Sequence, residues 1–136
     1  ATGSWVAFLD HDDELAPHAL YLVAVEVLRA PDAQVLYSDE DKIDEDGNRF
    51  EPHFKPQYDS DLLLAMNYLN HLTVLRRDLL DALGGLRLDL DGAQDHDLVL
   101  RAVATAGPRR ARTARIRPPP ATCRSSRRRF PRRWFP

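Results

Sequence analysis

Short apolar runs alternate with acidic clusters along the first part of the chain. Residues 5–9, Trp-Val-Ala-Phe-Leu, form an apolar run that ends at a polar cluster, which predicts a buried strand of a parallel sheet. Residues 34–37, Gln-Val-Leu-Tyr, predict a second short strand, again followed by acids. Between the two predicted strands, apolar residues at helical spacing indicate a helix: Leu20, Val23, Ala24, Val27 and Leu28. This order predicts a βαβ unit whose functional edge lies at the C-terminal ends of the strands.

The pattern also predicts the elements that follow. A tight turn at Asp46-Gly47 predicts the tip of a hairpin. Helical spacing is found over residues 59–68, and a third strand is predicted over residues 71–75. A helix over residues 77–83 is broken by Gly84-Gly85.

The last predicted helix begins near Gln94. Its apolar face consists of Leu98, Val99, Ala102, Val103 and Ala106. Asp97 and Arg101 stand at the i,i+4 spacing of a surface ion pair. Beyond Gly107 neither the helical nor the strand period continues, so we expect residues 107–136 to be a disordered tail.

Charge divides the chain near the same place. The 136 residues have a net charge of −2, but all 21 acidic residues lie in residues 1–101 beside only 8 basic ones, a balance of −13. Residues 102–136 carry 11 arginines and no acid. Such opposite segments rarely share one core. The abrupt change also looks like a shift of reading frame in an Arg/Pro-rich coding context.

Composition excludes several classes of protein. The single cysteine, Cys123, excludes an intrachain disulfide and a zinc site built on cysteines. No apolar run approaches the roughly 18 residues of a membrane span, and the N-terminus lacks the layout of a signal peptide. We therefore expect a cytoplasmic protein.

Three aspartates follow the first predicted strand: Asp10, Asp12 and Asp13. They repel one another unless a cation joins them, and Mg²⁺ or Mn²⁺ prefers such oxygen ligands and shares them with substrate phosphates. The alternative is a solvated loop that caps a helix. An aspartyl-phosphate phosphatase needs D-x-D-x-[TV], but Glu14 occupies the fifth position.

Two other metal sites fail on spacing. A calcium-binding loop ending in Asp44-x-Asp46-Gly47 would begin at Lys42 and finish at His53, neither of which is the required acid. The five histidines show no H-E-x-x-H spacing, so each is more typical of a surface residue than of a zinc ligand.

A second polar group, Gln94-Asp95-His96-Asp97, directly precedes the apolar helix. These acids either cap the helix or supply a general base. As a base, Asp95 stays ionised at neutral pH near a helix start and is intrinsically weak unless burial raises its pKa.

Four stretches taken together resemble the family 2 glycosyltransferases that build polysaccharides and O-antigen. They are WVAFLDHDDELAPHAL, LYSDEDKIDEDGNRFEPHFKP, NYLNHLTVLRRDLLDALGG and QDHDLVLR, in this order within residues 1–106. The resemblance implies a GT-A fold, a Rossmann-like α/β sandwich that binds a nucleotide sugar and a divalent metal. Residues 1–106 would be its central and C-terminal part, because in the family two or three strands precede the D-x-D.

The resemblance also implies roles for individual residues. Asp10 and Asp12 match the D-x-D, whose aspartates contact the ribose, the sugar and the Mn²⁺ or Mg²⁺ on the diphosphate. Asp13 extends this cluster, so Asp12 and Asp13 are the expected metal ligands. Asp95 matches the proposed base that takes a proton from the acceptor hydroxyl, although Gln94 replaces the commoner glutamate. Gly84-Gly85 would shape the acceptor side, and the stretch from Asp39 to Lys42 has no assigned role.

The function that the resemblance implies is metal-dependent, inverting sugar transfer in polysaccharide or O-antigen assembly. The donor would be a nucleoside-diphosphate sugar, with UDP-sugars favoured, and the acceptor a glycan or a lipid-linked glycan. We expect a fragment that is inactive alone, from an enzyme at the inner face of the membrane that binds no nucleic acid. The alternative is a protein that binds nucleic acid or an anionic surface through its arginine-rich tail.

Overall fold

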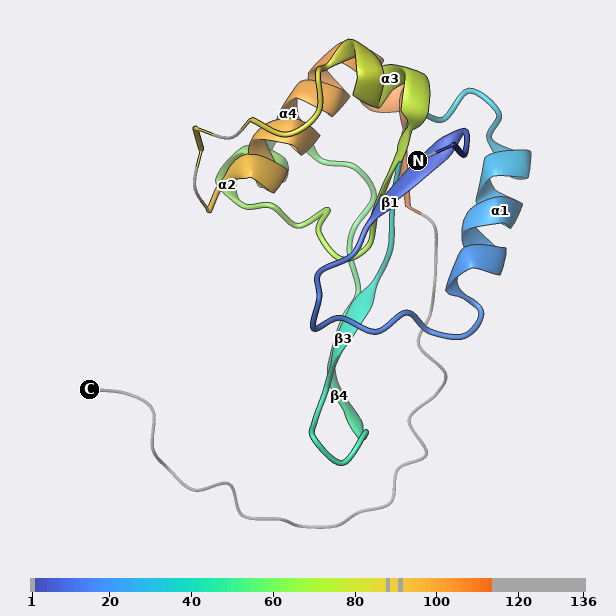
Figure 1. The fold of residues 1–136 in the computed structure, drawn as a ribbon, viewed down its shortest axis with the longest axis vertical. Helices are drawn as coiled ribbons and strands as arrows, with labels where there is room; N and C mark the ends of the chain where they lie inside the picture. Colours follow the sequence, from blue (N-terminus) through green and yellow to red (C-terminus); the bar gives the residue numbers. More distant parts are fainter. Residues whose placement is uncertain (1, 88, 91, 114–136) are drawn as a thin grey trace.

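The computed structural model describes residues 2–87, 89–90 and 92–113, which form a mixed α/β fold (Figure 1). One sheet contains β1 (Trp5–Phe8), β2 (Val35–Tyr37), β5 (Thr73–Arg76) and β6 (Ala111–Thr113). A separate hairpin contains β3 (Glu40–Ile43) and β4 (Arg49–His53). The helices are α1 (Ala19–Arg29), α2 (Ser60–Ala65), α3 (Arg77–Ala82) and α4 (Gln94–Ala106), with a 3-10 turn, η1, at Pro108–Arg110.

The strand order in the sheet is β1-β5-β2-β6. β5 runs antiparallel to both β1 and β2, and β6 runs parallel to β2. β1 and β2 therefore point the same way, as expected for a βαβ unit, but β5 lies between them. The prediction that β1 is a buried parallel strand was wrong, because β1 is the last strand of the described sheet and pairs only with the antiparallel β5.

Helices cover both faces of the sheet. Because successive strand residues point to opposite faces, neighbouring residues of β2 pack against different helices. Val35 and Tyr37 of β2 pack with residues of α2, α3 and α4, whereas Leu36 between them packs with α1. In Figure 1, α1 accordingly lies on one side of the sheet and α2, α3 and α4 on the other. The core is thus divided by β2 and β5 into two apolar layers.

The β3–β4 hairpin extends away from this sheet (Figure 1). Its tip confirms the predicted turn: Gly47 has a φ of 80°, and the Asp44 carboxylate accepts hydrogen bonds from the backbone N–H groups of Asp46 and Asn48. A residue with a positive φ is best tolerated as glycine. The hairpin directly follows β2, so its base lies at the C-terminal end of that strand.

The predicted helices are present with small changes at their ends, but the predicted apolar face of α1 is wrong: Leu20 and Leu28 are 60% and 82% exposed, and α1 buries Ala19 and Val23. α2 begins after Asp59, whose carboxylate caps two backbone N–H groups, and it ends at Ala65 rather than at residue 68. α4 buries all five residues of its predicted apolar face. The predicted Asp97–Arg101 ion pair is present at 2.7 Å.

Regular structure continues beyond the predicted domain boundary at residue 106. Residues 108–113 form η1 and β6, and Ala111 is buried against Val35 of β2. A three-residue strand with two arginines nearby shows no apolar run, so periodicity did not reveal it. Residues 114–136, the rest of the predicted tail, lie outside the described residues. In the described part, none of the helices has the length and apolar character to cross a membrane.

Candidate functional site

Asp10 and Asp13 lie in the loop that leaves the C-terminal end of β1. The loop turns back on itself there, because the backbone N–H of Asp13 donates to the carbonyl of Asp10 at 3.2 Å. Asp10 is largely exposed and Asp13 is half-buried. The sequence placed these acids correctly at a strand end.

The imidazole of His71 lies between these two carboxylates. Its Nε2 is 3.3 Å from Oδ2 of Asp10, and its Nδ1 is 3.7 Å from Oδ2 of Asp13. One donor atom from each of the three residues lies within 4.8 Å of the others. Two carboxylates and an imidazole at this spacing fit a divalent metal such as Mn²⁺.

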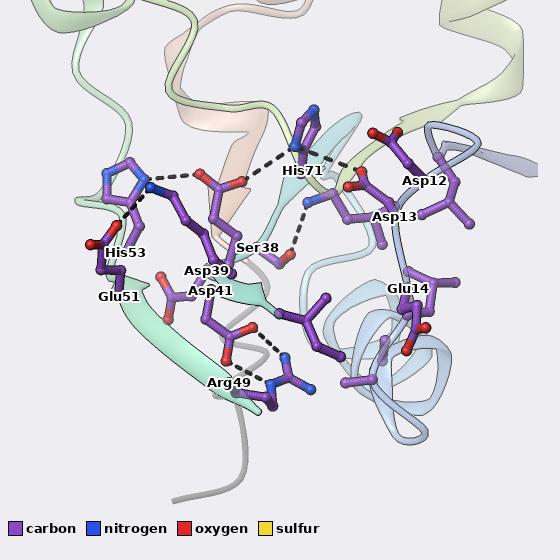
Figure 2. Close-up of a pocket in the computed structure, with 18 of the residues that line it drawn as sticks. Asp12, Asp13, Glu14, Ser38, Asp39, Asp41, Arg49, Glu51, His53 and His71 are labelled. Atoms are coloured by element: carbon purple, nitrogen blue, oxygen red, sulfur yellow. Dashed lines mark hydrogen bonds and ion pairs between the residues drawn. The ribbon is translucent and has the colours of Figure 1, made fainter. Parts of the chain in front are cut away.

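Asp12 lies beside this group and is not part of it. Its side chain is 77% exposed, and its ion-pair partner is His11 at 3.7 Å. Figure 2 shows Asp12 on the same loop as Asp13, at the edge of a pocket. The structure therefore brings together Asp10, Asp13 and His71, and the expected role of Asp12 as a ligand stays a prediction.

This pocket has a volume of about 820 Å³ and lies at the C-terminal ends of β1 and β2, next to the hairpin. Seven carboxylates and two strong cations, Lys42 and Arg49, line it. Both cations are already paired, Lys42 with Glu51 at 2.6 Å and Arg49 with Asp41 at 2.5 Å. The remaining charge is negative, so an anionic ligand would need a cation to enter with it.

The Asp39-Glu40-Asp41 stretch faces the same pocket, and each carboxylate has a different partner. Asp41 holds the guanidinium of Arg49 through two hydrogen bonds, which raise the pKa of Arg49 above its usual value. Glu40 lies between two imidazoles, with Oε1 3.0 Å from Nδ1 of His53 and Oε2 3.6 Å from Nδ1 of His71. Glu40 thereby joins the hairpin to the candidate metal ligands.

Lys55 follows the hairpin and is buried beneath it. Burial lowers the pKa of Lys55, and the nearby carboxylate of Glu40 partly offsets this. The backbone N–H of Lys55 donates to Asp39 at 2.8 Å. Its amine donates to the carbonyls of Asn70 and His71.

Asp95 lies in the first turn of α4, as predicted. Its Oδ2 accepts hydrogen bonds from the side-chain amides of Asn67, at 3.0 Å, and Asn70. Asp95 does not line the pocket. Its partner Asn70 directly precedes His71 in the chain, so the candidate base and the candidate metal ligands are connected through two neighbouring residues.

Sequence reasoning missed the residues that connect these groups: Glu40, Lys55, Asn67, Asn70 and His71. The stretch N-x-x-N-H before β5 places an amide and an imidazole next to each other, and this was the available signal. The role of this stretch depends on which loops fold against it, and the spacing of residues along the chain does not predict those contacts.

No protein-family model matches the chain. It is 47% identical over 103 residues to the uncharacterized protein y4gI of Sinorhizobium fredii, which covers 76% of this chain and 11% of that protein. It is 48% identical over 99 residues to the O-antigen biosynthesis protein RfbC of Myxococcus xanthus, which covers 73% of this chain and 8% of that protein. The chain thus spans about a tenth of the length of the curated relatives it matches.

Proposed function

We propose that the chain is part of an enzyme of polysaccharide or O-antigen biosynthesis, and specifically of a metal-dependent glycosyltransferase with a GT-A fold. The similarity to an O-antigen biosynthesis protein supports the biosynthetic role. The observation that carries the enzymatic proposal is the group of donor atoms from Asp10, Asp13 and His71 at the pocket. A nucleoside-diphosphate sugar is the proposed donor, because its diphosphate needs a cation in so acidic a pocket.

In this proposal Asp10, Asp13 and His71 hold Mn²⁺ or Mg²⁺, with Asp12 completing the contacts to the donor. The metal would neutralise the negative charge that develops on the departing diphosphate. A hydroxyl of a glycan or lipid-linked acceptor attacks the anomeric carbon from the face opposite the diphosphate. The bond from that carbon to the diphosphate oxygen breaks, which inverts the configuration.

Asp95 is the proposed base that receives the proton of the attacking hydroxyl. Asn67 and Asn70 both donate to Oδ2 of this carboxylate and so fix its plane, which leaves Oδ1 to accept the proton.

Calorimetric titration with UDP tests the donor site. We expect UDP to bind only when Mn²⁺ is present, and Asp13→Asn to weaken this binding at least about tenfold, since it removes a ligand charge. Asp32→Asn, an exposed acid in the turn between α1 and β2, is the matched control and should bind as the wild type does. Equal UDP binding in EDTA and in Mn²⁺ would contradict the proposal.

A separate measurement tests the base. In an intact enzyme that contains this chain, Asp95→Asn should keep Mn²⁺-dependent UDP binding and lose sugar transfer, followed as the release of UDP from a UDP-sugar in the presence of acceptor. Substantial transfer by Asp95→Asn would show that another group takes the proton. The alternative of nucleic-acid binding rests on the arginine-rich tail, most of which lies outside the described residues, and it stays a prediction.

A further inference from the structure

The amine of Lys55 is buried against the backbone of Asn70 and His71. His71 is a candidate metal ligand, and Asn70 donates to Asp95. The exposed fraction of the Lys55 side chain is 0%, and Nζ lies 3.4 Å from Oε2 of Glu40. Nζ also donates to the carbonyl of His71 at 2.9 Å and to that of Asn70. A buried ammonium is costly unless its three N–H donors have acceptors, and these three oxygens supply one each.

The two residues that Lys55 contacts belong to different halves of the candidate site. The side-chain amide of Asn70 donates to Asp95, and the ring of His71 lies between Asp10 and Asp13. The position of the backbone at residues 70–71 therefore sets the orientation of both halves. A group that fixes this backbone aligns the two together.

Residues at the base of the hairpin hold Lys55 in place. Asp39 at the end of β2 accepts the backbone N–H of Lys55, and Glu40 contacts both the amine of Lys55 and the ring of His71. We call Asp39, Glu40 and Lys55 the Lys55 brace. Its members come from the acidic stretch that the sequence left without a role, and from the segment just after β4.

We propose that Lys55 is a positioning residue, which holds Asn70 and His71 so that a single brace aligns the base with the metal ligands. The inference rests on the proposed function for the roles of Asp95 and of the metal. Lys55 itself touches neither substrate nor metal in this scheme. It acts by satisfying two carbonyls that have to stay in place while a charged donor enters and leaves.

The first test is made without metal, by nuclear magnetic resonance of the full chain. Lys55→Met keeps an unbranched side chain and removes the donors, and it should shift the side-chain amide signals of Asn70 toward those of a free amide. Arg77→Met is the control, because Arg77 is a cation that is 35% exposed, pairs with Asp81 of α3 and does not line the pocket. Where Lys55→Met does not fold, Lys55→Gln, which keeps a shorter polar end, replaces it. Unchanged Asn70 signals in the folded variant overturn the proposal.

The second test is the affinity for Mn²⁺, measured by electron paramagnetic resonance of the free ion. We expect Lys55→Met to weaken binding at least about tenfold, as loss of a group that orients a ligand does, and Arg77→Met, outside the pocket, to leave it unchanged. A purely structural lysine would lower the urea midpoint and leave the affinity of the folded protein unaltered, and that result overturns the proposal.

The two measurements separate this inference from the proposed function. If the wild-type chain binds no Mn²⁺, the metal part of the proposed function fails, and the Asn70 signals alone decide whether Lys55 positions the segment. If the wild type binds Mn²⁺ and only one of the two readouts changes in Lys55→Met, the claim that one brace serves both halves is wrong.

Discussion

At the scale of single residues, His71 changes what the acidic loop can do. Aspartates alone form a site for hard cations, which take oxygen ligands. Here an imidazole lies within 3.3 Å of Asp10 and 3.7 Å of Asp13. An imidazole suits transition metals better than Mg²⁺, so the donor set favours Mn²⁺ over Mg²⁺.

This preference is testable by substitution of the ring. His71→Asn should weaken Mn²⁺ binding at least about tenfold and Mg²⁺ binding less, because Mg²⁺ gains little from a nitrogen ligand. His11→Asn is the control, since His11 is 97% exposed and contacts Asp12 alone among the candidate acids. Titration of both ions against the two variants measures the change. Equal losses of Mn²⁺ and Mg²⁺ affinity would mean that His71 is not a ligand.

The same residues show how far sequence reasoning reaches at this scale. Asp10, Asp13 and Asp95 could be singled out, because acids at a strand end and at a helix start form recognisable local patterns. His71 and Lys55 could not, since a lone histidine and a lone lysine have no local signature. Their roles depend on contacts across 31 and 15 positions, to Glu40 in both cases.

At the scale of elements, the junction between α3 and α4 depends on Arg101. Its guanidinium donates to the carbonyls of Leu83 and Gly85, both at 2.9 Å, and to Asp97. The turn at Gly84-Gly85 needs glycine, because both residues have a positive φ. Because α3 ends at this turn, the carbonyls of Leu83 and Gly85 have no partner within a helix, and Arg101 donates to both.

Arg101→Met should therefore destabilise the fold by about 1–3 kcal/mol, the cost of leaving such acceptors unpaired. Urea unfolding at pH 7 measures this loss. Lys42→Met, which removes an exposed ion pair on the hairpin, should change the free energy of unfolding by less than about 1 kcal/mol. Equal losses in the two variants would show that Arg101 is only a surface ion-pair partner.

The same contact gives a pH dependence. The hydrogen bond from Arg101 lowers the pKa of Asp97 below its ordinary 3.8. A carboxyl with a lowered pKa in the folded state stabilises that state above its unfolded pKa, and the effect is lost as the pH falls through the folded pKa. The stability difference between the wild type and Asp97→Asn should be constant near neutral pH and shrink below about pH 3.8. Urea midpoints from pH 7 to pH 3 check this, and a difference independent of pH would contradict it.

Periodicity predicted the helices, but it predicted the buried face of α4 and not that of α1, whose Leu20 and Leu28 are exposed. α4 carries a complete apolar stripe, so its bounds and buried face follow from residues 94–106 alone. β1 has an equally clear apolar run, but its pairing was wrong because its partner β5 comes more than sixty residues later. Periodicity identifies a strand, and only the tertiary fold decides its neighbour.

At the scale of the whole molecule, β2 connects the core to the candidate site. All three of its residues are buried, with β5 on one edge and β6 on the other. Asp39 and Glu40 follow directly from its C-terminal end and join the pocket. Loss of β6, which pairs with β2, should therefore affect the strand that positions Asp39 and Glu40 of the Lys55 brace.

The last prediction concerns that edge. A chain that ends at residue 106 loses η1 and β6, including the buried Ala111 and the hydrogen bond from the N–H of Gln34 to the carbonyl of Arg110 at 2.9 Å. A chain that ends at residue 113 keeps them. The shorter chain should be less stable by about 2–4 kcal/mol, since several backbone hydrogen bonds and one apolar contact are lost at a buried strand. Urea unfolding of the two chains measures the difference. Equal midpoints would mean that β6 adds nothing to the stability of the fold, and would support the boundary at residue 106 that the change in periodicity predicted.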